Sequence, residues 1–197
     1  HKPMVLATGI ATEEDIQLAV EACRRMGNND ITVLKCTSSY PAPVEEANLC
    51  MIRDLAERFQ VKSGLSDHTL GSVSPIVAVT QGASMIEKHF ILNRSIGGPD
   101  CSFSMEEKDF AQMVKDVRMA ELSLGKTTYE LTEKMRGSRS ASRSLYVAED
   151  MKAGEVITER NVRSVRPGFG LHPKYLKDIL GKNVNRDLEK GTRFALE

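Results

Sequence analysis

The sequence predicts an α/β fold with a parallel sheet, followed by a small β-rich module. Short apolar runs alternate four times with helix-like segments over the first 125 residues, a pattern typical of parallel strands with helices packed outside. A polar segment rich in Arg, Ser and Lys follows at 126–142. Short strand-like runs separated by glycine turns then occupy residues 143–197, which indicates a separate module.

The first repeat sets the pattern for the others. The β-rich run Met4–Thr8 ends at Gly9. A helix is expected to begin at Thr12, because a Thr N-cap followed by acidic residues suits the helix dipole, and to stop at Gly27. The further strands are expected at Ile31–Cys36, Val61–Leu65 and Ser84–His89, and the further helices at Leu49–Phe59 and Pro75–Gln81.

The last helix of this part is predicted from a capping-box pattern, Ser104-Met105-Glu106-Glu107, and ends at Gly125. Alternation alone does not separate an open doubly wound sheet from a barrel. No glycine-rich nucleotide motif follows any strand, which disfavours nucleotide-binding folds. A complete eight-repeat barrel needs about 250 residues, so four repeats predict half of a TIM (β/α)8 barrel.

Two histidines stand at the ends of apolar strands, in Ser66-Asp67-His68-Thr69 and Glu87-Lys88-His89-Phe90. The same ends of adjacent parallel strands meet at one edge of a sheet, so both imidazoles would converge. This arrangement suits a divalent metal with open positions for water and substrate. The alternative, that either histidine is a hydrogen-bonded core residue, stays open at this point.

The last module is expected to contain short strands, two matching glycine turns and one short helix. Its strands are expected at Leu145–Val147, Val162–Val165 and near Val184, its turns at Lys152–Glu155 and Glu189–Thr192, and its helix at Pro173–Leu180, stopped by Gly181. A module of about 55 residues is marginally stable alone, so we expect it to dock on a partner surface.

Composition excludes several functions. The chain has 27 basic and 27 acidic side chains, so it has no general attraction to nucleic acid or anionic membranes. It lacks Trp, which disfavours a base-stacking surface, and contains no apolar run near the roughly 18 residues of a membrane span and no signal-peptide pattern. Four scattered cysteines without CxxC spacing indicate a reduced, cytoplasmic protein.

Several motifs, taken together and in order, resemble the sialic-acid synthase family. They are KPMVLATG at Lys2–Gly9, KCTSSYP at Lys35–Pro41, GLSDHT at Gly64–Thr69, EKHF at Glu87–Phe90 and GPD at Gly98–Asp100. The last module, with Val165-Arg166-Pro167-Gly168, resembles the antifreeze-like C-terminal domain of that family. The stretches Arg163–Pro173 and Cys101–Ser104 resemble the pseudaminic acid synthase branch.

The resemblance implies the C-terminal half of a TIM barrel at 1–125, a linker at 126–142 and a β-clip SAF domain at 143–197. It also implies a C–C bond-forming transferase that condenses phosphoenolpyruvate with an open-chain amino-sugar aldehyde. The expected product is pseudaminic acid, used in bacterial surface glycans or flagellin glycosylation. The alternatives are N-acetylneuraminate synthesis, a spore-coat polysaccharide synthase with a different acceptor, and a truncated non-catalytic sugar- or partner-binding fragment.

The resemblance also implies site residues. The family holds a divalent ion, commonly Mn²⁺ with Mg²⁺ or Co²⁺ as alternatives, through two histidines that match His68 and His89. The expected substrate contacts are Thr8, Ser38, Tyr40, Ser66 and Asp100. In the sialic-acid branch Ser38 is typically Asn and Ala7 is typically Ser, which leaves the phosphate contacts there open. Polar residues that merely end strands, and a turn Asp at position 100, are the structural alternatives.

Three further expectations follow from the resemblance. Asp67 and Glu87 either fix the imidazole tautomers or are structural carboxylates. Arg166 matches an arginine that reaches the active site of the other protomer, so a domain-swapped homodimer is expected, with Phe169 and His172 completing the lid. The alternative is an exposed surface arginine.

The family's first half-barrel, which carries a catalytic Glu and Lys, has no counterpart in this sequence. A half barrel leaves sheet edges open, so the chain alone is expected to be inactive. The sequence does not decide whether the other half belongs to a longer protein or to a second chain.

Overall fold

The computed structural model describes residues 2–196, and the chain divides into two compact units, His1–Lys126 and Thr127–Glu197. Each unit has its own buried core. Within the described residues, no helix combines the length and the apolar character needed to cross a lipid bilayer.

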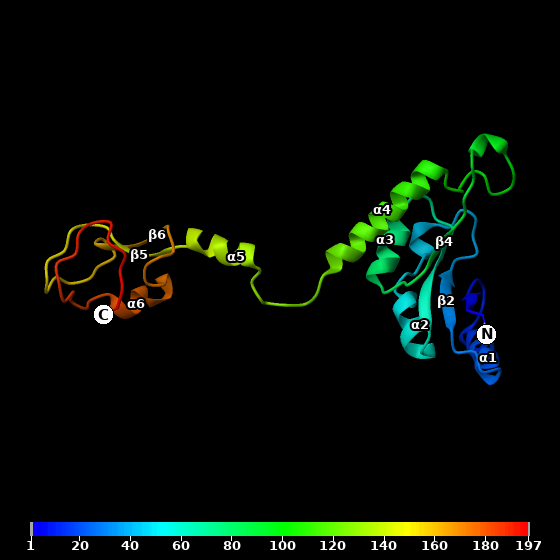
Figure 1. Cartoon of the computed structure of the whole chain (residues 1–197), viewed down its shortest axis with the longest axis horizontal. Helices are drawn as coiled ribbons and strands as arrows, with labels where there is room; N and C mark the ends of the chain where they lie inside the picture. Colours follow the sequence, from blue (N-terminus) through cyan, green and yellow to red (C-terminus); the bar gives the residue numbers. More distant parts are fainter. Residues whose placement is uncertain (1, 197) are drawn as a thin grey trace. The chain divides into compact units, whose positions relative to one another are not determined.

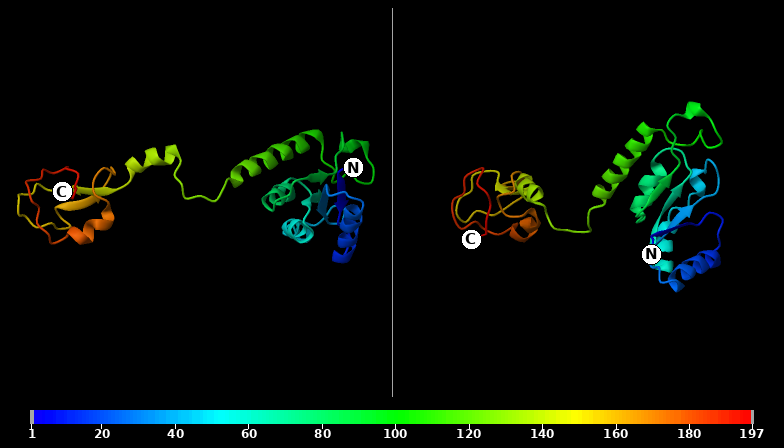
Figure 2. Two further views of the ribbon diagram at one scale, coloured as in Figure 1. Left: turned by 60° about the horizontal axis from the view of Figure 1, so that its bottom comes forward. Right: turned by 45° about the vertical axis from the view of Figure 1, so that its right-hand side comes forward.

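The first unit is built on a four-stranded parallel sheet (Figure 1). Its strands are β1 (Met4–Ala7), β2 (Ile31–Cys36), β3 (Lys62–Asp67) and β4 (Ile86–Lys88), and they pair in chain order. A doubly wound sheet reverses its strand order at a switch point, whereas a barrel adds each strand beside the previous one. The unreversed order and the curl of the sheet (Figure 2) confirm the predicted half barrel.

Helices cover one face of this sheet. They are α1 (Glu13–Arg25), α2 (Met51–Phe59), α3 (Val73–Thr80) and α4 (Glu107–Leu124), with short 3-10 helices η1 (Val44–Glu46) and η2 (Arg94–Ile96) in the loops. Val20 of α1 and Leu55 of α2 pack against Ile31 and Val33, which share one face of β2. Two further buried clusters join α2 and α3 to β3, and α3 to α4.

The predicted start and stop of α1 are confirmed. The hydroxyl of Thr12 accepts a hydrogen bond from the Asp15 N–H at 3.3 Å, and the Asp15 carboxylate accepts one from the Thr12 N–H at 2.9 Å. Gly27 follows the helix with φ +73°, a conformation that glycine adopts at little cost. Local sequence signals therefore determine both ends of this helix.

The capping box predicted at Ser104–Glu107 is wrong. Helix α4 begins at Glu107 after Glu106, whose side chain makes no capping hydrogen bond. Met105 instead forms a parallel bridge with Phe90, and its N–H donates to the carbonyl of His89 at 2.9 Å. The backbone at Met105 extends the sheet edge beyond β4, so it is not available to begin a helix.

Strands β3 and β4 approach closely at Gly64. A Cβ atom at this position would collide with the carbonyl oxygen of Met85 and with the side chain of Leu34. The missing side chain therefore lets β3 lie tightly between its two neighbours, which brings the ends of β3 and β4 together.

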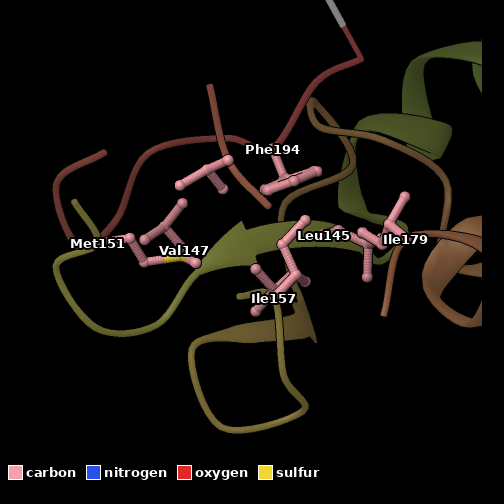
Figure 3. Close-up of a cluster of buried hydrophobic side chains, with 8 residues drawn as sticks. Leu145, Val147, Met151, Ile157, Ile179 and Phe194 are labelled. Atoms are coloured by element: carbon pink, nitrogen blue, oxygen red, sulfur yellow. The ribbon is translucent and has the colours of Figure 1, made fainter. Parts of the chain in front are cut away.

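The second unit forms around an antiparallel pair, β5 (Ser144–Val147) and β6 (Val162–Val165). Eight buried side chains converge on one core (Figure 3), namely Leu145, Val147, Met151, Ile157, Val162, Ile179, Val184 and Phe194. The predicted helix consists of η4 (Pro173–Tyr175) and α6 (Leu176–Ile179). The strand expected near Val184 is reduced to an isolated bridge between Val156 and Asn183.

The two matching turns are confirmed. The N–H of Glu155 donates to the Lys152 carbonyl at 2.9 Å, and the N–H of Thr192 donates to the Glu189 carbonyl at 3.1 Å. Their glycines have φ values of +85° at Gly154 and +91° at Gly191, which a type II turn requires at its third residue.

The segment predicted as a linker, 126–142, contains helical structure. Helix α5 (Glu133–Ser138) is capped by Thr132, whose hydroxyl accepts from the Met135 N–H, and η3 (Arg139–Ala141) follows it. The Ser140 carbonyl accepts a hydrogen bond from the Gly168 N–H at 2.9 Å. This helical segment is therefore joined to the loop that carries Arg166.

Candidate active site

The candidate site lies at the carboxyl ends of β2, β3 and β4, on the sheet face away from the helices. The two histidine rings lie edge to face with centroids 5.1 Å apart and planes inclined by 72°. Because successive residues of a strand point to opposite faces, Asp67 and Lys88 point to the other side. The convergence predicted for His68 and His89 is therefore present.

His68 is held in one orientation by the backbone. Its side chain is buried, with the residue only 7% exposed, and its Nδ1 lies 2.9 Å from the carbonyl oxygen of Thr37. A carbonyl can only accept, so Nδ1 is the donor, and in the neutral imidazole Nε2 then has the free lone pair. The His68 carbonyl in turn accepts from the Ala42 N–H at 2.9 Å. This geometry prepares Nε2 of His68 as a ligand.

His89 is oriented by its neighbours. Its Nδ1 lies 3.8 Å from the Asp100 carboxylate, which is too long for a hydrogen bond. The ring of Phe103 packs against it with centroids 5.0 Å apart. Asp100 thus lies beside the histidine pair.

Tyr40 closes one side of this cluster. Its ring lies 4.3 Å from that of His68, 6.1 Å from that of His89 and 5.9 Å from that of Phe103, measured between centroids. Tyr40 itself is 54% exposed. An exposed aromatic ring beside two imidazoles offers a flat apolar surface and a hydroxyl to a bound substrate.

The two carboxylates flanking the histidines have different neighbours. Asp67 accepts from Lys88 Nζ at 2.6 Å and from the Thr69 N–H at 2.9 Å, so it does not fix an imidazole tautomer by a hydrogen bond. Glu87 accepts from the Ser66 hydroxyl at 2.7 Å. Neither carboxylate hydrogen-bonds to an imidazole. The Thr37 carbonyl holds the His68 ring, and the His89 ring packs on Phe103.

The remaining candidates of the first unit lie at the ends of β1 and β2. The hydroxyl oxygen of Thr8 accepts from the Cys36 N–H at 3.0 Å, while its own proton can still be donated. Ser38 is exposed and lies against Gly9, where an added Cβ would come within 3.3 Å of its hydroxyl oxygen. Burial lowers the pKa of nearby Lys35, whose ammonium donates to the Cys36 carbonyl and to Thr37 Oγ1.

The candidates of the second unit are exposed. Arg166 precedes Pro167 in the loop after β6, and among the described residues its guanidinium makes no hydrogen bond or ion pair. Phe169 is 60% exposed. Nδ1 of His172 accepts from the Lys174 N–H at 3.1 Å, so His172 caps a short helix. The exposed guanidinium of Arg166 is available to an external partner.

Sequence reasoning missed three contributors. Thr37 provides the carbonyl that orients His68, Phe103 packs on His89, and Lys88 pairs with Asp67. Strand alternation was a usable signal for Lys88, because it places this lysine on the same face of β4 as Ile86, which packs on the helix-side core. A lysine on such a face requires an acidic partner. Nothing in the sequence indicated the contacts of Thr37 and Phe103, which depend on loop conformation.

Within residues 2–196, no group of three or more His, Cys, Asp or Glu side chains is arranged to hold a metal ion. His68 and His89 could supply two imidazole ligands, with the remaining positions open to water and substrate. This pair of donors fits a divalent transition metal. In His68, Nδ1 is bonded to the Thr37 carbonyl, so Nε2 on the opposite side of the neutral ring is the nitrogen that could bind the ion.

The fold and site together define half of a (β/α)8 barrel with a histidine pair at its strand ends, joined in the chain to a separate small β module. The chain belongs to the NeuB family, whose model matches residues 1–129, and the SAF domain model matches residues 142–193.

Named relatives agree with this membership. The chain is 48% identical over its full length to a pseudaminic acid synthase of Helicobacter pylori, of which it covers 58%. It is 47% identical to a pseudaminic acid synthase of Campylobacter jejuni, with 96% of this chain and 55% of that protein covered. The chain therefore spans little more than half the length of these relatives.

A solved structure agrees with the fold. A spore coat polysaccharide biosynthesis protein of Bacillus subtilis matches 98% of this chain and 60% of its own, with a TM-score of 0.61 and 31% identity. The similarity therefore extends across both units of the chain.

Proposed function

We propose that the chain forms the histidine-bearing half of a phosphoenolpyruvate-dependent synthase whose product is pseudaminic acid. The observation that supports this is the similarity, over the whole chain, to named pseudaminic acid synthases. The activity belongs to a protein with a complete barrel. The described cysteines form no disulfide, which supports a reducing compartment, the cytoplasm.

The proposed reaction joins two small molecules. C3 of phosphoenolpyruvate attacks the aldehyde carbon of an open-chain amino sugar, and this forms the new C–C bond. Water adds at C2, and phosphate leaves with cleavage of its C–O bond. The products are a nine-carbon keto acid and inorganic phosphate, so all atoms balance.

A divalent ion would act as a Lewis acid toward the aldehyde oxygen. We propose Mn²⁺ as this ion, with Mg²⁺ or Co²⁺ as alternatives, and His68 and His89 as its protein ligands. The buried position of His68 and the carbonyl on its Nδ1 reduce the freedom of its ring. The free-energy cost of reorganising the site is therefore small when the acceptor is oriented for attack.

The other residues of the site would position the substrates. The Asp100 carboxylate is suited to accept hydrogen bonds from hydroxyl or amide groups of the sugar. The hydroxyls of Thr8 and Ser38 are neutral donors for the carboxylate and phosphate of phosphoenolpyruvate. Ser66 would join them by turning its hydroxyl proton from Glu87 to the substrate. The ring of Tyr40 offers a surface against which the acceptor chain can lie.

Arg166 is proposed to act on the site of a second protomer in a homodimer. Its exposed guanidinium presents five donors in a fixed fork. Mixing Arg166→Ala protomers with His68→Ala protomers should restore one working site in each heterodimer, while each parent homodimer stays nearly inactive. No recovery, with heterodimers verified by native mass spectrometry, would show that Arg166 acts within its own chain or not at all.

The substrate is tested by phosphate release. A protein with a complete barrel should release phosphate from phosphoenolpyruvate with a 2,4-diacetamido-2,4,6-trideoxy hexose and far more slowly with N-acetylmannosamine. The chain alone should release none, and adding the other half-barrel should restore the reaction. A preference for N-acetylmannosamine would assign the protein to ordinary sialic acid synthesis.

A further inference from the structure

The buried ion pair behind the histidines is unlike the surface pairs of this chain. Lys88 Nζ lies 2.6 Å from Asp67 Oδ2, and each side chain is only 1% exposed. The Arg58–Asp54 pair on α2 has side chains that are 48% and 39% exposed. A buried pair gains little net stability, because both charges lose their hydration. A role other than stability is therefore expected.

The charges of this pair are also bound to the backbone. The second carboxylate oxygen of Asp67 accepts from the Thr69 N–H at 2.9 Å, and Lys88 Nζ also donates to the Thr69 carbonyl at 2.6 Å. Both backbone groups of Thr69 are therefore fixed by the pair. Thr69 directly follows His68, so the chain is held on both sides of that histidine.

The pair is in register with the two histidines. Asp67 and Lys88 face each other across β3 and β4, and each directly precedes a histidine in the sequence. Since alternate residues point to opposite faces, one cross-strand pair points toward the helices and the next pair, His68 and His89, points into the site. Fixing the first pair therefore fixes the separation of the second.

We propose that Asp67 and Lys88 are positioning residues that hold the His68 and His89 rings at the spacing a shared divalent ion requires. The metal part of this inference rests on the proposed function, whereas the ring spacing does not. Groups behind metal ligands commonly change metal affinity by about 10–100-fold when they are replaced.

The test uses the full chain and the double variant Asp67→Asn/Lys88→Met. This variant removes both charges at similar volume, so no unpaired charge stays buried. We expect the proton NOE between the rings of His68 and His89 to weaken without any metal. In a separate titration with Mn²⁺ alone, paramagnetic broadening of both ring signals should need at least about tenfold more ion. The matched control, Asp54→Asn/Arg58→Met, should behave as wild type in both measurements.

The outcomes separate the inference from the proposed function. A folded double variant with an unchanged NOE and Mn²⁺ response within about twofold of wild type would overturn the positioning role. An NOE that weakens while wild type shows no broadening would support the positioning role but overturn the metal assignment. If the double variant does not fold, Asp67→Glu keeps the charge and displaces the carboxylate by one methylene, and wild-type ring spacing there would also overturn the inference.

Discussion

The two units of the chain bury their apolar side chains differently. The second unit gathers eight buried residues into one cluster. The first unit divides its buried residues among three clusters on the helix side, while Val5, on the opposite face of β1, is 43% exposed. That open face also carries the histidine pair. The first unit is therefore stabilised on one side of its sheet and is proposed to do chemistry on the other.

This difference predicts whether a substitution changes mainly binding or mainly stability. A change on the open face of the first unit should alter binding more than stability, because none of the three buried apolar clusters lies on that face. A change in the single core of the second unit should destabilise that unit as a whole, because its core residues contact one another (Figure 3). Four predictions test the comparison, from the largest expected effect to the smallest.

The strongest test removes one imidazole from the open face. His68→Ala should weaken Mn²⁺ binding by at least about 100-fold, because a direct ligand matters more than the groups behind it. Paramagnetic broadening of the His89 ring signals measures this loss. His172→Ala, in the second unit, is the matched control and should leave the broadening unchanged. Equal broadening in both variants would remove His68 from the metal site.

The core of the second unit is tested by Leu145→Ala. Leu145 is fully buried at 0% exposure, so we expect a loss of about 2–5 kcal/mol in the free energy of unfolding. Hydrogen exchange resolved by peptide should show faster exchange throughout 144–194 and unchanged exchange in β2 and β3. Faster exchange in both units would show that their stabilities are coupled.

A smaller effect is expected at the start of α1. Thr12→Ala removes the hydroxyl that accepts from the Asp15 N–H and should cost about 1 kcal/mol. Chemical denaturation followed by circular dichroism measures the change, with Thr12→Ser as the variant that keeps the cap. A Ser variant as unstable as the Ala variant would mean that the hydroxyl is not responsible.

The smallest effect is a pH dependence in the second unit. The hydrogen bond from Lys152 and that from the Ala153 N–H hold the pKa of Asp187 below 3.8. Because the folded-state pKa is depressed, the stabilisation is fully present above the unfolded value and is lost as the pH falls through the lower folded-state pKa. The unfolding temperatures of wild type and Asp187→Asn should therefore approach each other as the pH falls from neutral into the acid range. A constant difference between the two proteins would contradict this linkage.

Local patterns were enough for much of the fold. The apolar runs predicted the parallel sheet, and Thr12, Gly27, Gly154 and Gly191 marked helix ends and turns that the structure confirms. These features depend on hydrogen bonds and backbone angles within a few residues, so the sequence expresses them directly. The pattern at Ser104–Glu107 predicted a capping box that does not form, because the Met105 N–H donates a hydrogen bond to the carbonyl of His89, a residue outside the local sequence.

The sequence by itself determined the half barrel, the β module and the presence of two histidines at strand ends. The tertiary structure alone decided how those histidines are held. The Thr37 carbonyl selects the tautomer of His68, and Lys88 forms an ion pair with the carboxylate of Asp67. Both contacts join segments more than 20 residues apart. Such contacts depend on how strands and loops pack against one another in space. The spacing of residues along the sequence does not reveal that packing.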